Sequence, residues 1–457
     1  MSKDEYLITD KPLKALTVFA MPMILGSFFQ QIYNMADSII VGQFVGSSAL
    51  AAVGACAALT NVFICVALGA GVGAGVLVSR YFGAREYGKM KTIVSTSLIS
   101  FLLLSIVLGV FGFFFANSMM SGLQTPADIL DDAVLYLRVY FVGFPFLFMY
   151  NILSTMFTSI GESKIPLGLL IFSSILNILM DLWMVAGLGL GVFGAAIATL
   201  IAQGISAVFS FLIFFARMNQ YKSPFNRFER QELYSMLRIA VPSVLQQSTV
   251  SIGMMIVQAV VNPFGTQALA GYTATMRVEN VFSLIFVSIG NAVSPYVSQN
   301  LGAKKYQRIR KGVHSGTYMA LLTSVVISGV MVLFGRNILS LFVSGEPEQI
   351  RQVLDIAYKY LFIMAIFLWV LYLLYVYRSA IQGLGNTLIP LASGIAEFVM
   401  RVSVALLLPK LIGEDGIFYA EICAWTSAAV LLFISYMIII RKYKDSSDSS
   451  ELPAKGL

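Results

Sequence analysis

The chain has 457 residues, of which 58% are hydrophobic and 12% are charged, against about 25% charged residues in soluble domains. This composition excludes a soluble enzyme, a disordered chain and a secreted disulfide scaffold, and it predicts a protein that crosses a membrane many times. The 30 Lys and Arg exceed the 23 Asp and Glu, which gives a net charge of +7. In a membrane protein, an excess of Lys and Arg usually comes from the cytoplasmic loops, so it does not indicate a nucleic-acid partner.

Twelve apolar segments are each long enough to cross a bilayer core of ~30 Å, which takes about 20 helical residues. The runs lack the period-2 alternation of membrane strands. We therefore predict an all-α membrane protein with twelve transmembrane helices, near residues 15–38, 52–78, 93–117, 133–159, 165–187, 191–216, 235–261, 271–298, 314–343, 356–382, 388–410 and 416–440.

The charges of the loops predict the orientation of these spans. Lys and Arg gather at 80–91, 217–238, 304–311 and 441–444, whereas the loop at 39–51 has none. Basic loops stay in the cytoplasm, so we expect a plasma-membrane protein with both termini cytoplasmic.

The two halves of the chain repeat each other. Three blocks of the first half recur in the same order in the second half: GSSALAAVGA (46–55) as GTQALAGYTA (265–274), VSRYFGA (78–84) as VSQNLGA (297–303), and GESKIP (161–166) as GNTLIP (385–390). Six spans per repeat predict two lobes of like topology related by an axis along the membrane normal.

The predicted organisation has five parts. They are a cytoplasmic N-terminal segment (1–14), an N-lobe with spans 1–6 (15–216), a cytoplasmic inter-lobe loop (217–234), a C-lobe with spans 7–12 (235–440) and a cytoplasmic polar tail (441–457). Two-lobe helical bundles of this kind bind their cargo near the bilayer midplane and rock between two states, as transporters do.

Ionisable residues inside spans are costly and are therefore candidates for function. The sequence places seven of them in the predicted spans: Asp37, Asp181, Glu279, Glu397, Glu421, Arg277 and Arg401. With one histidine and three scattered cysteines in the chain, no cofactor and no His- or Cys-based metal site is expected.

Asp37 and Asp181 form the predicted ion-binding pair. Gln30, Asn34 and Asp37 are spaced i, i+4, i+7 and share one face of the first helix, and Asn177 precedes Asp181 by one turn in the fifth,. Two carboxyl groups in one poorly hydrated chamber cannot easily both ionise, so the pair is predicted to bind a proton or a cation. A structural alternative is that each acid only caps a helix end or joins a hydrogen-bond network.

The internal repeat makes this pair asymmetric. With a shift of 220 residues, Asp181 falls on Arg401 and Asn177 on Glu397, while Asp37 falls on an apolar residue. A site built on the two aspartates is therefore predicted only in the N-lobe.

In the C-lobe, Glu397 and Arg401 are spaced i, i+4 and are expected to form an ion pair. Arg277 and Glu279 are two residues apart and face different directions, and together with the pair they are candidates to line a C-lobe cavity. Glu421, near the start of the last span, is expected at the membrane interface.

Pro22 lies inside the first span, fifteen residues before Asp37. Proline removes one backbone hydrogen bond of a helix and permits a bend. A hinge that couples ion binding to bending and a fixed kink are both compatible with this position.

The ordered set of features resembles the multidrug and toxic compound extrusion (MATE) family. Two six-helix repeats, YNMADSIIVG in the first span, the GAREY and GAKKY loops and the two G-x-[ST]-x-x-P turns carry this resemblance. Asp37, Asn177, Asp181 and Pro22 look most like the DinF-type branch. In that branch the matching acids are implicated in H⁺ or Na⁺ coupling and the first helix is proposed to bend at the matching proline.

The resemblance implies secondary active export of cationic, amphipathic compounds, driven by inward H⁺ or Na⁺. The sequence leaves the choice of ion open, and Asp37 and Asp181 are the only residues at which a metal ion, Na⁺, is considered. The alternative is a lipid-linked precursor flippase of the same wider superfamily, which would need an arginine-rich cavity. The expected partners are small molecules and the lipid bilayer, and an internally duplicated transporter can work as a monomer.

Overall fold

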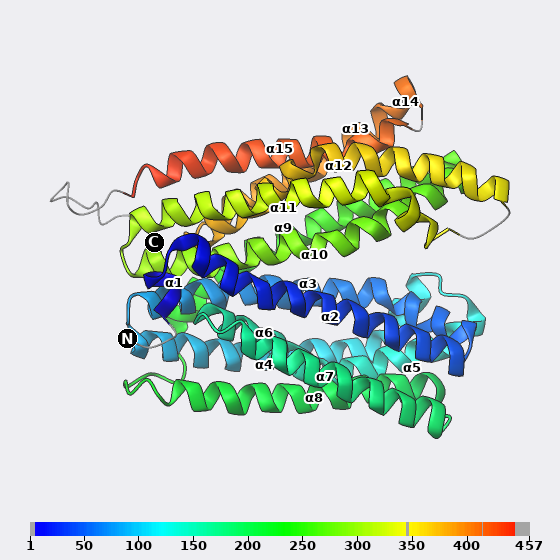
Figure 1. The fold of residues 1–457 in the computed structure, drawn as a ribbon. Helices are drawn as coiled ribbons and strands as arrows, with labels where there is room; N and C mark the ends of the chain where they lie inside the picture. The colour runs from blue at the N-terminus through cyan, green and yellow to red at the C-terminus, as the bar shows by residue number, and fades with distance from the viewer. Residues whose placement is uncertain (1–4, 344–346, 414, 444–457) are drawn as a thin grey trace. The chain divides into compact units, whose positions relative to one another are not determined.

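The computed structural model describes residues 5–343, 347–413 and 415–443, and these residues are helical with no strand (Figure 1). A short helix, α1 (Tyr6–Thr9), precedes the first span. The other described elements of the first half are α2 (Pro12–Phe44), α3 (Ser47–Gly83), α4 (Tyr87–Gly122), α5 (Ala127–Val142), α6 (Phe144–Ser159), α7 (Lys164–Asp181), the π-helix η2 (Leu182–Gly187) and α8 (Gly191–Met218).

The second half has the same succession of long helices. Its elements are α9 (Arg230–Val261), the 3-10 helix η3 (Asn262–Phe264), α10 (Thr266–Gly302), α11 (Tyr306–Ser340), α12 (Pro347–Gly383), α13 (Leu388–Leu407), α14 (Pro409–Ile412) and α15 (Asp415–Ile440).

The prediction of twelve transmembrane helices is confirmed. Among the described residues, eleven helices are long and apolar enough to span a membrane, and the bent pair α5 and α6 supplies the twelfth. The pair bends by 53° at Gly143. Pro145 follows at the start of α6, where a missing backbone N–H costs little, so the bend falls between two regular helices.

The chain forms two compact units, one of residues 21–244 and one of residues 1–20 with 245–457. The helix α2 passes from the second unit into the first between Ala20 and Met21, directly before Pro22. The helix α9 makes the opposite passage between Val244 and Leu245, shortly after Pro242. Each unit thus contains the start of the proline-bearing helix that continues in the other.

The glycine-rich run at 69–75 permits close helix packing within unit 21–244. A Cβ at Gly73 would lie 2.7 Å from the carbonyl oxygen of Met236 in α9, and one at Gly75 would lie 2.9 Å from Cγ2 of Thr155 in α6. Two sides of one α3 segment therefore meet two different helices. Small residues in membrane helices characteristically allow this approach.

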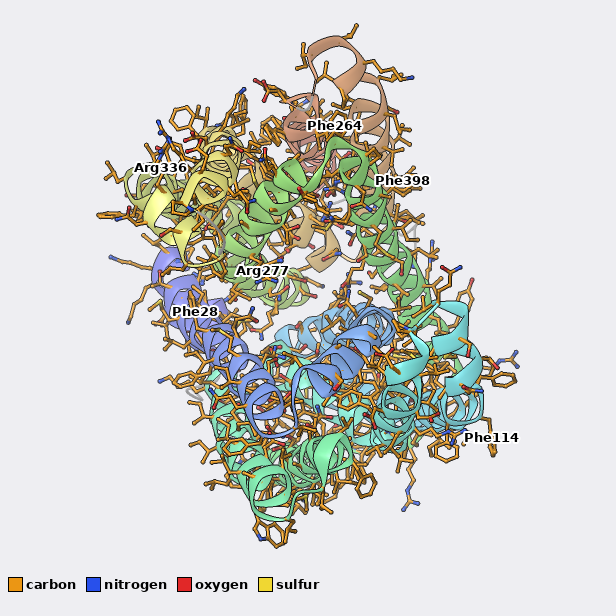
Figure 2. All side chains as sticks on the ribbon, turned by 90° about the vertical axis from the view of Figure 1, so that its right-hand side faces the viewer. Phe28, Phe114, Phe264, Arg277, Arg336 and Phe398 are labelled. Atoms are coloured by element: carbon orange, nitrogen blue, oxygen red, sulfur yellow. The ribbon has the colours of Figure 1, made fainter. Side chains whose placement is uncertain are left out.

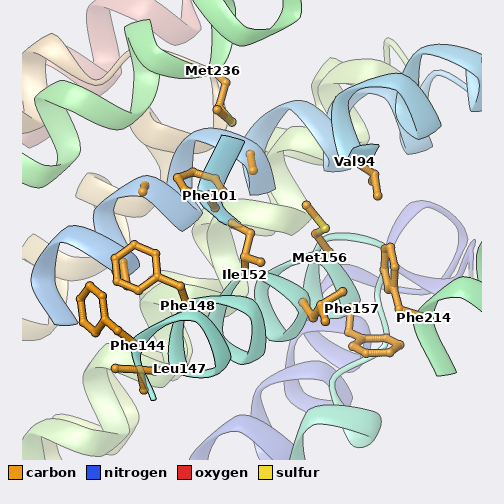
Figure 3. Close-up of a cluster of buried hydrophobic side chains, with 14 of the residues drawn as sticks. Val94, Phe101, Phe144, Leu147, Phe148, Ile152, Met156, Phe157, Phe214 and Met236 are labelled. Atoms are coloured by element: carbon orange, nitrogen blue, oxygen red, sulfur yellow. The ribbon is translucent and has the colours of Figure 1, made fainter. Parts of the chain in front are cut away.

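Aromatic side chains fill the core of the same unit. Figure 3 shows part of this cluster, in which α4, α6, α8 and α9 contribute buried residues including Phe101, Phe144, Phe148, Phe157, Phe214 and Met236. Apolar residues also cover the outside, as expected of helices that face lipid. Phe114 in α4 projects outward with 72% of its surface exposed (Figure 2).

The basic start of α11 anchors the N-terminal segment. Arg308 donates from Nη2 to the carbonyl oxygens of Leu7 at 3.3 Å and Asp10 at 2.6 Å. Arg310 donates to the carbonyl oxygen of Ile440 at 3.1 Å. Hence α1, the α10–α11 loop and the end of α15 lie at the same end of their unit (Figure 1).

Close packing at Gly312 in α11 predicts a stability difference between two glycines of this helix. A Cβ at Gly312 would collide with the ring of Tyr296, which is held by its hydroxyl bond to the carbonyl oxygen of Arg308 at 3.1 Å. At Gly329 nothing lies within 4 Å of the added atom. Overpacking costs about 1–3 kcal/mol, so Gly312→Ala should lower the melting temperature in detergent whereas Gly329→Ala should leave it unchanged or slightly raised. Equal melting temperatures for the two variants would contradict this packing.

Candidate functional site

The two predicted aspartates lie on helices of the same unit. Asp37 is in the last third of α2, and Asp181 is the final residue of α7. The π-helix η2 begins directly after Asp181. Single π-turns inside helical segments occur often at functional sites, because the wider turn re-aims side chains and leaves the backbone ladder irregular.

The structure brings the carboxyl groups of Asp37 and Asp181 within hydrogen-bonding reach of each other. Asp181 is fully buried, Asp37 is half-buried, and the buried Oδ1 atom of each has no other hydrogen-bond partner among the described residues. Ionised carboxylates have only acceptors, so a hydrogen bond between two of these groups needs a proton. Neither aspartate forms a salt bridge with a Lys or Arg of the described chain.

Asn177 and Thr199 complete a polar cluster around the pair. With its amide nitrogen facing Asp181, Asn177 donates to Oδ2 of Asp181 at 2.8 Å, and its oxygen accepts from the backbone N–H of Thr199 at 3.3 Å. This orientation satisfies both amide atoms, so it is the one the network supports. The hydroxyl of Tyr33 also reaches Thr199. The cluster thus joins α2, α7 and α8.

Apolar side chains surround this cluster. Buried residues of α2, α3, η2 and α8 pack together beside it, namely Ile40, Val41, Ala49, Val185, Val192 and Ala195. A cavity of about 10 Å³, lined by residues that include Tyr136, Tyr140, Thr199 and Gln203, borders the polar cluster on the α5 and α8 side. That volume admits about one water molecule. Asp181 is fully buried and Asp37 is half-buried, so the carboxyl pair is poorly hydrated and lies near one small, mainly apolar pocket.

Gln30 and Asn34 are not part of this cluster. Both side chains are exposed, although they share a helical face with Asp37 in the sequence pattern. Pro22 is buried within an uninterrupted α2.

Thr199 and Tyr33 are members of the cluster that the sequence analysis missed. A threonine inside an apolar helix commonly bonds the carbonyl oxygen four residues earlier, as Thr199 does to Ala195 at 3.0 Å,. Its residue type and spacing therefore carry no signal of a site. A Tyr on the same span as Asp37 is equally ordinary.

A second polar cluster lies in the unit that contains residues 245–457. The carboxylate of Glu397 forms salt bridges with Arg378 at 2.8 Å and with Arg401 at 3.0 Å. Arg401 also binds Glu421, with its closest contact at 2.8 Å. The predicted pair of Glu397 and Arg401 is confirmed, and Arg378 in α12, which the sequence analysis did not single out, extends it.

Glu421 is buried inside its unit. It is 1% exposed and its carboxylate binds two nitrogens of Arg401. Its position near the start of a span says how far along the helix it lies, but not which neighbour its face meets. Span ends are poor guides to burial for this reason.

Arg277 and Glu279 diverge, as their spacing predicted. Arg277 is exposed on α10 (Figure 2), whereas Glu279 is buried with 7% exposure. Oε2 of Glu279 has no hydrogen-bond partner among the described residues.

The geometry can be compared with known proteins. The sequence model of the MatE family matches this chain at residues 22–183 and again at 242–407. The chain belongs to the MatE family. The two matched ranges start 220 residues apart, which agrees with the internal repeat. The chain is thus a MATE-family membrane transporter and not an enzyme.

Relatives and solved structures span nearly the whole MATE chain. "Probable multidrug resistance protein YoeA" of Bacillus subtilis (strain 168) is 27% identical over 96% of this chain and 98% of its own length. "Multidrug export protein MepA" of Staphylococcus haemolyticus is 26% identical over 98% and 100%. A structure titled "Outward-facing conformation of a multidrug resistance MATE family transporter of the MOP superfamily" has a TM-score of 0.90 at 23% identity, covering 98% of this chain and 100% of that one. This last likeness concerns the fold.

The buried ion pairs predict a large stability cost for one conservative change. Glu397→Gln removes the charge that both Arg378 and Arg401 face, and stranding buried charges costs about 3–5 kcal/mol. Asp355→Asn breaks an exposed pair with Arg336, at 2.7 Å with side chains 52% and 59% exposed, and such pairs contribute about 0–1 kcal/mol. Thermal unfolding of both purified variants should show a large drop only for Glu397→Gln, and similar drops would refute the buried network.

Proposed function

We propose that this chain is a secondary active multidrug exporter that moves cationic, amphipathic compounds outward in exchange for inward H⁺ or Na⁺. The proposal places it in the cell membrane with both termini cytoplasmic. The observation that carries it is the contact between Asp37 and Asp181, two poorly hydrated carboxyl groups that form no salt bridge with a Lys or Arg among the described residues. The names of the relatives support export of drugs.

The paired carboxyl groups would act as the coupling site. Bound H⁺ or Na⁺ neutralises the pair, and loss of the ion leaves like charges facing each other, which forces the helices that carry them to adjust. One charge moving down a potential of ~100 mV supplies about 2.3 kcal/mol, enough for about a fortyfold concentration ratio. The free energy of the ion gradient is therefore sufficient for export.

The surroundings favour H⁺ over Na⁺ as the coupling ion. Na⁺ needs several oxygen ligands, and among the described residues no group of three or more His, Cys, Asp or Glu is arranged to hold a metal ion. A shared proton needs only the two carboxyl groups.

Two buried arginines of the unit with residues 245–457 favour an exporter over a flippase of lipid-linked precursors. Such a flippase would need unpaired arginines to bind a pyrophosphate head group. Arg378 and Arg401 are instead held by Glu397 and Glu421.

Neutralising Asp37 should abolish coupled export. Asp37→Asn cannot ionise, so the pair loses its ability to take up and release an ion while the shape of the side chain is retained. In proteoliposomes that contain Asp37→Asn, ethidium transport driven by an imposed pH gradient should fall to the level measured in vesicles without protein. The matched control is Asp128→Asn, an exposed acid in the first turn of α5, which should keep wild-type transport.

The same vesicles identify the coupling ion. A pH gradient without Na⁺ should drive wild-type transport, whereas a Na⁺ gradient at equal pH should not. Full transport by Asp37→Asn would remove the aspartate from the coupling mechanism, and transport driven by Na⁺ alone would replace the proton by Na⁺.

Pro22 is proposed to be the hinge of α2. Its position beside the boundary between Ala20 and Met21 supports a bend there, because the missing hydrogen bond lowers the cost of bending. Pro22→Ala restores a bond of about 1 kcal/mol net and should slow ethidium export severalfold without changing proton release on titration. Pro126→Ala, at the N-cap of α5, should leave the rate unchanged. A wild-type rate in Pro22→Ala would mean that the kink is fixed.

A further inference from the structure

We propose that the loop between α8 and α9 (residues 219–229), together with Arg230 at the start of α9, binds the phosphate head groups of acidic phospholipids. The site lies in unit 21–244, at the leaflet that this end of the unit meets. The inference goes beyond the proposed function, because it concerns the membrane and neither the exported compound nor the coupling ion.

The backbone of the loop is held against α4. Three hydrogen bonds of 2.6–3.1 Å join backbone atoms of the loop to hydroxyl groups of α4, namely Arg227 to Ser95, Asn226 to Thr92 and Glu229 to Thr96. A Cβ at Gly88 of α4 would lie 2.7 Å from the carbonyl oxygen of Pro224, so the loop approaches this helix as closely as a glycine permits. The loop therefore has a fixed position on α4.

These contacts place the loop at the level of the lipid head groups. The α4 residues that bind it, 92–96, lie at the start of the predicted span 93–117. A bilayer adds roughly 5–8 Å of polar head groups on each side of its hydrocarbon core, and one turn of a helix rises about 5.4 Å. A loop fixed beside the first turn of a span thus lies where the lipid phosphates are.

Two phenylalanines of the loop are exposed. Phe225 and Phe228 leave 46% and 48% of their surfaces open. Exposed rings are unfavourable in water, whereas an aromatic side chain at the boundary of head groups and acyl chains buries its ring among them. The ammonium group of Lys91 lies 5.6 Å from the centroid of the Phe225 ring. A basic group and an aromatic ring therefore share this surface.

Three basic side chains flank the two rings. Lys222, Arg227 and Arg230 are exposed, and none forms a salt bridge with an acid among the described residues. The acid of the loop, Glu229, accepts a hydrogen bond from Asn226 at 3.4 Å. Arginine and lysine bind phosphate oxygens through charge-assisted hydrogen bonds, and arginine can bind two oxygens at once. The surface thus carries a positive charge that suits a phosphate group.

The opposite end of the same unit carries the reverse charge. Asp128, Asp131 and Asp132 are exposed in the first two turns of α5, which follows the far end of α4. Like charges repel, so acidic head groups are attracted to the α8–α9 loop and repelled from the start of α5.

The exposed rings favour a lipid over a soluble anion as the ligand. A free phosphate would bind the basic groups but leave Phe225 and Phe228 in water. A phospholipid offers both partners, because its phosphate meets the bases and the upper part of its acyl chains meets the rings.

Native mass spectrometry of the full-length protein in a neutral detergent tests this inference. Wild type should bind phosphatidylglycerol more tightly than phosphatidylcholine. A base near acidic lipid contributes about fivefold to binding, so Arg227→Gln combined with Arg230→Gln should raise the apparent Kd for phosphatidylglycerol about twenty-five-fold. The matched control, Arg351→Gln with Lys410→Gln, removes two exposed bases outside the loop and should keep the wild-type Kd. An unchanged Kd in the loop variant would overturn the proposal.

A second pair of variants tests the position of the loop with every base retained. Gly88→Ala should push the loop away from α4 and weaken phosphatidylglycerol binding severalfold. Gly122→Ala, at the other end of α4, has nothing within 4 Å of the added atom and should bind as wild type does. Equal affinities for these two variants would contradict a site built on α4.

A soluble competitor identifies the source of the phosphate. Glycerol 3-phosphate carries the phosphate without acyl chains, so at equal concentration it should not displace phosphatidylglycerol from the wild-type protein. Displacement would assign the surface to soluble phosphates and overturn the assignment to lipid.

Discussion

The contact between two poorly hydrated carboxyl groups is the constraint on which the proposed coupling depends. Asp37 and Asp181 belong to different helices, and in the part of the chain that the structure describes neither forms a salt bridge with a basic residue. Their proximity is stable only when an ion is shared between them, since like charges in a poor solvent repel strongly. In the proposed mechanism, the relative position of α2 and α7 is therefore linked to occupancy by the ion.

The two units handle buried charge in different ways. In unit 21–244, carboxyl groups face each other beside Asn177 and Thr199. In the unit with residues 245–457, Glu397 and Glu421 are closed into ion pairs by arginines. The two halves repeat in sequence, but among the described residues they differ in how their buried acids are partnered. Oε2 of Glu279 is buried in the second unit without a hydrogen-bond partner among those residues.

The helices α2 and α9 each belong partly to both units, and each carries its proline within a few residues of the boundary. Asp37 lies on such a helix and Asp181 does not. In the proposed coupling, ion binding at Asp37 changes the bend of α2 at Pro22, and the bend moves the part of the helix that precedes Pro22.

The sequence by itself determined the twelve spans, the duplicated topology and the candidate aspartates, because hydrophobic length and the cost of buried charge are local properties of the chain. Only the tertiary structure decided which polar faces meet. It left Gln30 and Asn34 exposed, brought Thr199 to the aspartates and buried Glu421 against Arg401. Spacing along a helix fixes which residues share a face, whereas the identity of the facing residue depends on how separate helices pack, and packing is set by the whole unit.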